Sequence, residues 1–167
     1  RCSGEVYACF AAAGIDYGPG MRAIRTLATG TDEHGRPQAL AEIALPQHLI
    51  ETFDRYLVHP SLMDAGFQAT IGMLLAGAGT SGKGLALPFA LDNLLVYGPT
   101  PRQAWAWCRS AAGSSDCGKV DIDIFDASGQ VAIQVQGLSM RELAPPPGQR
   151  YLFAPAWTEA LPPVQGR

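Results

Sequence analysis

The segment from residue 60 to about residue 78 constrains the fold most, because it is apolar on every side of the helix that it predicts. Its large apolar residues are Leu62, Met63, Phe67, Ile71, Leu74 and Leu75. A helix with such residues all round is buried over most of its surface. The chain must therefore supply a sheet that wraps around this helix.

The flanking segments predict that sheet. Residues 21–28 and 38–45 are expected to pair as a hairpin, and residues 85–97, 104–110, 120–126 and 131–143 are extended segments separated by Gly, Pro, Ser and Asp turns. In residues 120–126 apolar residues alternate with Asp, as in an antiparallel sheet that has one face on the core and one face exposed to solvent. A short surface helix over residues 3–14, with Ser3 as its N-cap, comes first. The fold class is therefore α+β.

A domain boundary is expected near residue 143. Three prolines at 145–147 cannot donate to a strand ladder and favour an extended linker. Residues 1–143 are thus expected to form one domain, and residues 144–167 a Pro-rich linker to a further domain.

Composition and charge exclude several classes of function. The formal net charge is −3, and the 12 Lys and Arg residues are scattered, whereas nucleic-acid-binding proteins gather them on one face. The four cysteines form no CxxC pair and have no histidine at metal-ligand spacing, so no metal is expected. No apolar run suits a membrane span or a signal peptide, so we expect a cytoplasmic protein.

Asp64 is the most unusual residue, because it stands one turn into the apolar helix. Burial would favour its protonated form and make it available as a general acid. Gln68 lies one helical turn further on the same face, where its amide can orient the carboxyl. An Asp near a helix start can equally serve as a cap, and spacing alone does not separate the two roles.

Three other features have both a structural and a functional interpretation. His59 could be a catalytic base, but a residue that anchors the helix entry before Pro60 is the favoured interpretation. Tyr17, followed by Gly18 and Pro19, could place a phenol at a pocket mouth, although a plain turn explains the same residues. The proline of Leu87-Pro88-Phe89 marks an edge strand or a bulge, which can form a pocket wall.

These motifs, in this order and spacing, resemble the second hotdog of polyketide synthase dehydratases. The specific string is HP-x-x-x-D-x-x-x-Q at residues 59–68, supported by Tyr17-Gly18-Pro19, Leu87-Pro88-Phe89 and the closing strands. The tail at residues 151–157 also looks like the linker that leads into the next part of a modular synthase. The chain is therefore expected to be the C-terminal half of a double hotdog, with an antiparallel sheet around a long helix.

The resemblance implies a lyase of antibiotic-type biosynthesis that removes water from a β-hydroxyacyl thioester on an acyl carrier protein. The Asp at the position of Asp64 would protonate the departing hydroxyl, oriented by Gln68 and near Tyr17. The expected substrate-binding residues are Gly18, Pro19, His59, Leu87, Pro88 and Phe89. The domain itself needs no metal or cofactor, since the phosphopantetheine belongs to the carrier protein. Expected partners are that carrier, an upstream N-terminal hotdog, neighbouring synthase domains and a second copy in a homodimer.

The sequence also departs from the family. The HxxxGxxxxP motif that supplies the catalytic histidine is absent, because none of His34, His48 and His59 has Gly four residues later. Met21 replaces a common aromatic residue, and Leu91 stands where Trp is frequent. Two alternatives therefore stay open: another reaction of the same fold, namely conjugate addition with chain branching, cyclisation or a double-bond shift, or a non-catalytic structural role.

Overall fold

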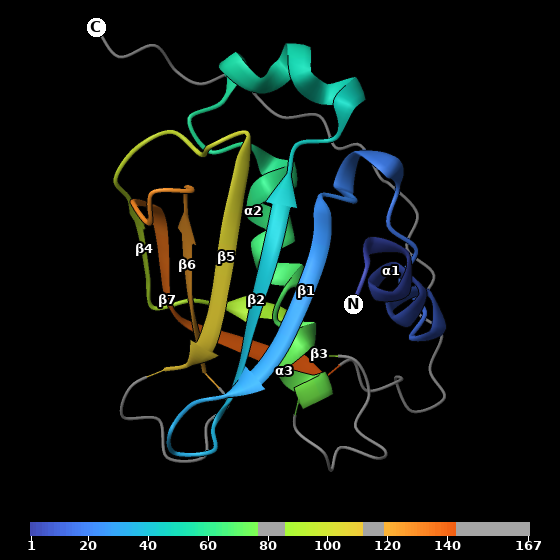
Figure 1. Cartoon of the computed structure of the whole chain (residues 1–167), viewed down its shortest axis with the longest axis vertical. Coiled ribbons are helices and arrows are strands. Elements are labelled where there is room, and N and C mark those ends of the chain that lie inside the picture. The colour runs from blue at the N-terminus through green and yellow to red at the C-terminus, as the bar shows by residue number, and fades with distance from the viewer. Residues whose placement is uncertain (77–85, 112–118, 143–167) are drawn as a thin grey trace, which may run out of the picture.

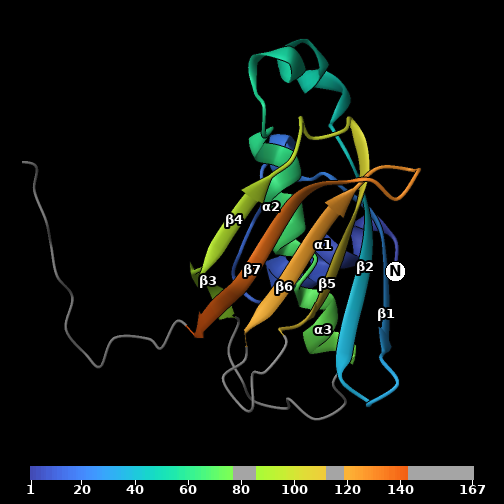
Figure 2. The same cartoon turned by 90° about the vertical axis from the view of Figure 1, so that its left-hand side faces the viewer.

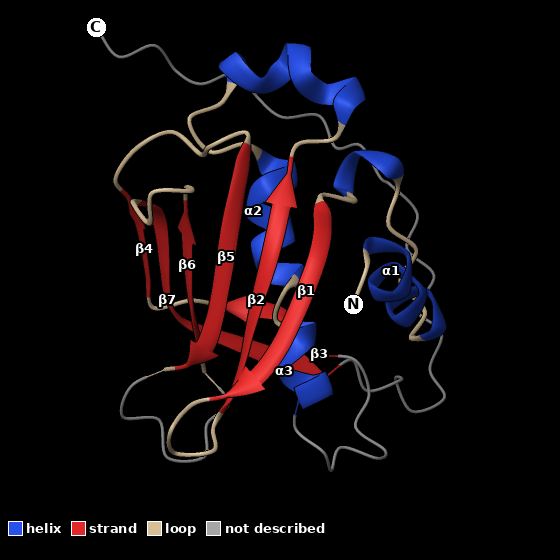
Figure 3. Ribbon diagram, viewed as in Figure 1, coloured by secondary structure: helices blue, strands red, loops and turns tan. Residues whose placement is uncertain are grey.

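The computed structural model describes residues 1–76, 86–111 and 119–142 and shows a sheet curled around a central helix, α2 (Figure 1). The strands are β1 (Ile24–Thr31), β2 (Pro37–Ala44), β3 (Ala86–Ala90), β4 (Asn93–Val96), β5 (Gln103–Ser110), β6 (Val120–Phe125) and β7 (Val131–Glu142). The α-helices are α1 (Ser3–Ala12), α2 (Pro60–Gln68) and α3 (Ile71–Ala76), and two 3₁₀ segments are η1 (Pro19–Met21) and η2 (Gln47–Arg55). Figure 3 distinguishes these helices and strands by colour. The α+β class is confirmed.

All strand pairs in the seven-stranded sheet are antiparallel, in the order β1-β2-β5-β6-β7-β3, with β4 also paired to β7. The predicted hairpin is confirmed as β1 and β2, in which Leu27 lies opposite Ala41. Its turn is held by the Asp32 carboxylate, which accepts hydrogen bonds from the backbone amides of His34 and Arg36. The sheet thus forms the wrapping that the apolar helix requires.

The predicted strand over residues 85–97 is two strands, β3 and β4, which pair with different parts of β7. β3 pairs with residues 139–142 and β4 with residues 133–136. Between those parts Gly137 has a φ of +66°, and a Cβ atom there would lie 2.0 Å from Asp92 Oδ2. A glycine inside a strand marks such a bend. β3 ends the strand order and its register shifts after Pro88, as expected for a proline at an edge or bulge.

The predicted long helix is buried as expected, but it is broken into α2 and α3 at Ala69 and Thr70. The amide of Thr70 donates to the Phe67 carbonyl three residues back, and the Thr70 hydroxyl donates to the same oxygen at 2.7 Å. A Thr side chain that competes for a backbone carbonyl in this way favours a helix end. The break directs α3 along β1 and β2, while α2 contacts β2, β5 and β6.

Helix α1 lies beside β1 (Figure 1) and buries Val6, Tyr7 and Phe10. Its N-cap is Cys2 and not the expected Ser3, because the Cys2 amide donates to the Glu5 carboxylate at 2.8 Å in a capping box. Within the described ranges, no helix combines the length and apolarity that crossing a membrane requires. The expected linker at residues 144–167 lies outside the described residues.

Replacing Gly72 by Ala should destabilise the fold. Gly72 is buried where α3 meets the hairpin, and an added Cβ would lie 2.6 Å from the Ala39 Cβ. Overpacking of this kind costs about 1–3 kcal/mol, which exceeds the gain of up to about 1 kcal/mol from higher helix propensity. Chemical denaturation should therefore show a lower free energy of unfolding. The matched control is Gly4→Ala in α1, where no atom lies within 4 Å and the helix gains stability; equal shifts in the two variants would contradict the packing explanation.

Candidate active site

A small cavity of about 40 Å³ opens between α2, the Tyr17 turn and β3. The predicted site residues that line it are Tyr17, Asp64, Gln68, Leu87 and Pro88. Its apolar wall includes Phe10, Phe67 and Met140. Segments distant in the sequence thus meet around one carboxyl group.

Asp64 lies half-buried on α2, and its Oδ2 accepts a hydrogen bond of 2.6 Å from Gln68 Nε2. It does not cap the helix, because the N-cap is His59, whose Nδ1 accepts from the Ser61 amide. Burial raises the pKa of the Asp64 carboxyl above its usual value, and the bond from Gln68 opposes this rise. The carboxyl therefore keeps its proton to a higher pH than an exposed Asp would.

Gln68 is buried, and its amide connects Asp64 to two other elements. Nε2 also donates to the Met21 carbonyl at 2.9 Å, and Oε1 accepts from the Tyr7 hydroxyl at 2.9 Å. Tyr7 was not predicted. The signal in the sequence is a phenol on the apolar face of α1, since a buried Tyr hydroxyl needs a hydrogen-bond partner.

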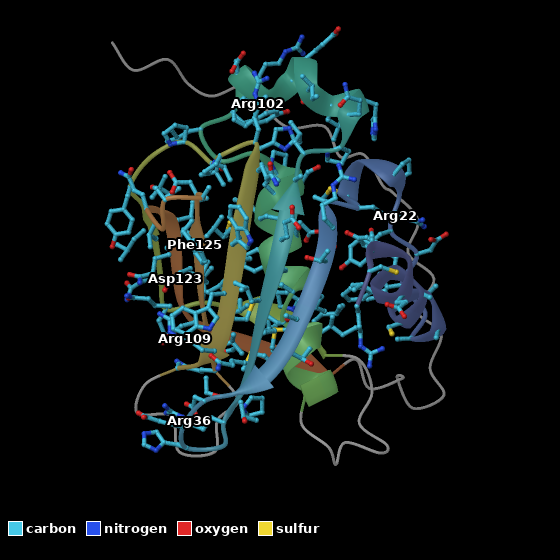
Figure 4. All side chains as sticks on the ribbon, in the orientation of Figure 1. Arg22, Arg36, Arg102, Arg109, Asp123 and Phe125 are labelled. Atoms are coloured by element: carbon cyan, nitrogen blue, oxygen red, sulfur yellow. The ribbon has the colours of Figure 1, made fainter. Side chains whose placement is uncertain are left out.

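Tyr17 lies half-buried at the cavity, with its ring edge-on to Phe10 at 5.0 Å between centroids. Burial, and next the charge of Asp64, raise the pKa of its phenol. The Tyr17 backbone is held by Arg22, which is labelled in Figure 4 and donates from Nε to the Tyr17 carbonyl at 2.7 Å. Gly18 and Pro19 are exposed and do not line the cavity.

His59 is not brought to the cavity. The side chain is buried, and both ring nitrogens have partners: Nδ1 accepts from the Ser61 amide, and Nε2 lies 3.1 Å from the Thr52 hydroxyl. Burial lowers the pKa of the ring, which favours its neutral form. These contacts anchor the start of α2, as the position of His59 before Pro60 predicts, and the substrate contact that the resemblance implied stays a prediction.

The strand β3 provides one side of the cavity through Leu87 and Pro88. Phe89, the next residue of β3, does not line the cavity. The Phe89 side chain is 65% exposed and lies under the Arg141 guanidinium, 5.1 Å from the ring centroid. Ligand pockets typically have about 300–1,000 Å³, so this cavity forms only part of a site for a larger substrate. Across the part of the chain that the structure describes, no group of three His, Cys, Asp or Glu residues is placed to hold a metal ion.

Comparisons with known proteins agree on one family. The family model described as the polyketide synthase dehydratase N-terminal domain matches residues 2–150. Polyketide synthase PksM of Bacillus subtilis is 37% identical over 146 residues, which cover 84% of this chain and 3% of PksM. Polyketide synthase ThaG of Burkholderia thailandensis is 33% identical over 148 residues, covering 81% of this chain and 2% of ThaG.

Solved structures give the same result. A trans-AT polyketide synthase dehydratase domain from Brevibacillus brevis superposes with a TM-score of 0.76 at 33% identity, covering 86% of this chain and 48% of that one. The dehydratase of the CurK module of the curacin synthase gives 0.71 at 29% identity, covering 85% and 47%. Two further CurK structures are inactive mutants, one with a His replaced by Phe and one with an Asp replaced by Asn.

These findings confirm the hotdog fold and correct the expected position of the chain. The expectation of a C-terminal hotdog half is wrong, because the matching family model describes the N-terminal domain. The chain spans about half the length of the solved dehydratase domains. It spans only a few per cent of the curated synthases.

Proposed function

Because the chain belongs to the polyketide synthase dehydratase family, we propose that it forms one half of a domain that removes water from a β-hydroxyacyl thioester. The observation that carries this proposal is the Asp64 carboxyl, which lines a cavity while Gln68 holds one of its oxygens. A half-buried acid with a raised pKa is suited to give a proton to a leaving group.

In the proposed reaction a base removes the proton from the α-carbon, and the electron pair forms the α,β double bond as the β carbon–oxygen bond breaks. Asp64 donates its proton to the departing hydroxyl, which leaves as water, and the base passes its proton back to Asp64 through solvent. Tyr17 lies beside the acid and can donate a hydrogen bond to the substrate oxygen. The products are an enoyl thioester and water.

In this proposal the base is a histidine from outside the described residues of this chain. His34 and His48 are exposed, His59 is buried away from the cavity, and none of the three lines it. In CurK, replacement of either a His or an Asp gives an inactive dehydratase. We propose that the other half of the domain provides the base, as a histidine, opposite Asp64.

The other half would also complete the substrate site. β4 lies beside β7 at one border of the sheet (Figure 2), and the side chains of Leu94, Leu95 and Val96 are all exposed there. An exposed apolar strand invites pairing, so this border can receive the second half. An acyl carrier protein would deliver the substrate on phosphopantetheine, and neighbouring synthase domains and a second copy are the further proposed partners. The proposed site needs no cofactor of its own.

The test of this function is to incubate the complete dehydratase domain with a carrier-bound β-hydroxyacyl thioester and to follow the intact mass of the carrier. Loss of one water from the acyl chain supports dehydration. With the enoyl thioester as a second substrate, a product of the same mass that separates from the substrate on chromatography indicates a double-bond shift or cyclisation, and an added carbon fragment indicates branching. No change in the substrate would favour the structural role.

The proposed acid predicts a definite pH dependence. Asp64 must be protonated to act, so its contribution is present below its pKa and is lost as pH rises through that pKa, which gives the descending limb of the profile. The base must be unprotonated and gives the ascending limb at lower pH. Because burial raises that pKa, the loss should occur at a higher pH than for an exposed Asp. The measurement is kcat/KM of the complete dehydratase against pH. If the residual activity of Asp64→Asn retains the same descending limb, another group is the acid.

A further inference from the structure

Tyr7 is connected to the proposed acid through Gln68, and it has no role in the reaction described so far. We propose that Tyr7 is a positioning residue: its hydroxyl fixes the amide of Gln68, so that Gln68 bonds Oδ2 of Asp64 and leaves Oδ1 to carry the transferable proton. This inference rests on the proposed function of Asp64 as the acid. It adds a third residue, from α1, to the pair that α2 provides.

The backbone determines where the Tyr7 hydroxyl hydrogen points. The Ile24 amide donates to the Tyr7 oxygen at 3.1 Å, so that oxygen acts there as an acceptor. The hydroxyl hydrogen then goes to Gln68 Oε1 at 2.9 Å, because the other acceptor in reach, the Met21 carbonyl, is further away at 3.4 Å. The start of β1 thus sets the direction of donation toward Gln68.

These partners allow only one orientation of the Gln68 amide. The Met21 carbonyl can only accept, and it lies 2.9 Å from Gln68 Nε2. If the amide were turned over, its oxygen would face this carbonyl and its NH2 group would face the Tyr7 hydroxyl hydrogen, so both hydrogen bonds would become repulsive contacts. A donor on the opposite side, the Tyr7 hydroxyl, stabilises the same orientation.

The orientation of Gln68 decides which oxygen of Asp64 holds the proton. Oδ2 accepts from Gln68 Nε2 at 2.6 Å, and a carboxyl oxygen that accepts from an amide is the one without the hydrogen. The proton therefore occupies Oδ1. The same bond stabilises the carboxylate that remains after proton transfer, since a hydrogen bond to the charged form favours it.

Tyr7 itself is held firmly enough to position Gln68. Its ring is buried and packs edge-on to Tyr17 at 6.0 Å, while the Arg22 guanidinium lies over it at 5.5 Å from the centroid. Burial raises the pKa of Tyr7 to about 12, so its hydroxyl keeps the hydrogen throughout the neutral range.

The test is Tyr7→Phe in the complete dehydratase domain, which removes the hydroxyl and keeps the ring. Loss of orientation should lower kcat by about 10- to 100-fold, with KM changed less than about twofold because Tyr7 does not touch the substrate. Weaker bonding from Gln68 should also raise the Asp64 pKa and shift the descending limb to higher pH. The matched control is Tyr56→Phe, because Tyr56 is 48% exposed and does not line the cavity, so its kinetics should not change.

A carbon-13 NMR titration of the Asp64 carboxyl in the resting protein gives a readout that does not depend on turnover. Tyr7→Phe and Gln68→Met should both raise its pKa, and the double variant should shift it no further than Gln68→Met alone. An unchanged pKa and kcat in Tyr7→Phe, with only a lower Tm, would overturn the proposal.

Two outcomes separate this inference from the proposed function. If Asp64→Asn still dehydrates the substrate, the acid role fails, yet the pKa shift still reports the hydrogen-bond arrangement. If Asp64→Asn is inactive and Tyr7→Phe is unchanged, only the positioning role fails. Should Tyr7→Phe not fold, NMR of the unchanged protein decides: a Tyr7 hydroxyl proton protected from solvent exchange, with Gln68 side-chain amide protons that shift as Asp64 titrates, supports the proposal, whereas fast solvent exchange of that hydroxyl together with Gln68 amide protons that do not shift overturns it.

Discussion

Asp64→Asn should lower the dehydration rate of the complete domain by about a hundred- to ten-thousandfold, the usual contribution of a general acid. The change keeps the shape of the side chain, and the Asn carbonyl can still accept the hydrogen bond that Gln68 Nε2 gives to Asp64. What is lost is the proton that the leaving hydroxyl needs. Single-turnover measurements on a carrier-bound β-hydroxyacyl thioester would follow the chemical step directly.

The matched control for this prediction is Asp54→Asn. Asp54 is exposed and lies 3.7 Å from Arg102, which is labelled in Figure 4. Exposed ion pairs of this kind contribute little to stability, so both rate and fold should be unchanged. A normal rate in Asp64→Asn would remove this residue from the reaction, whereas a low rate in both variants would point to a general loss of structure.

Leu62→Ala should lower the free energy of unfolding by about 2–5 kcal/mol, the range for a large-to-small change in a packed core. Leu62 is fully buried on α2, in the same apolar cluster as Ile43 and Ile122 of the surrounding sheet. Its removal leaves a cavity between the helix and the strands that wrap it. Denaturant unfolding, analysed for both midpoint and slope, would measure the loss.

Leu57→Ala is the control of the same chemistry, because the Leu57 side chain is 61% exposed. Its effect should stay within about 0.5 kcal/mol, as for most surface changes. If the two variants lose equal stability, the α2 face at Leu62 does not form the core of the fold.

Local periodicity explains how much of the fold could be predicted. The β1–β2 hairpin and the burial of α2 follow from apolar residues at strand and helix spacing, which the sequence displays directly. The division into β3 and β4 does not, because it depends on Gly137 and on the close approach of Asp92, which are distant in the sequence. The break at Thr70 was missed for a similar reason, since helix propensity alone does not show where a side chain will bond the backbone.

The contacts of the candidate site also fall into those that the sequence predicts and those that only the folded structure reveals. Asp64 and Gln68 stand four residues apart on one helix, so their contact was predictable from spacing. The hydrogen bond between Tyr7 and Gln68 joins residues 61 positions apart and appears only once α1 is packed beside β1. The expected C-terminal position was wrong, because the family model of the N-terminal domain matches residues 2–150. The pattern of helix and strands predicts the fold class and does not by itself say which half of a larger domain the chain forms.

The break between α2 and α3 has a consequence for how new substrate ranges can arise. Asp64 and Gln68 lie before it, while Ile71, which also lines the cavity, follows it at the start of α3. Residues after the break can therefore change in size or polarity without turning the acid and its amide partner about the axis of α2. Evolution, or a designer who wishes to admit a different acyl chain, can alter the shape of the cavity at these positions while the proton donor keeps its geometry.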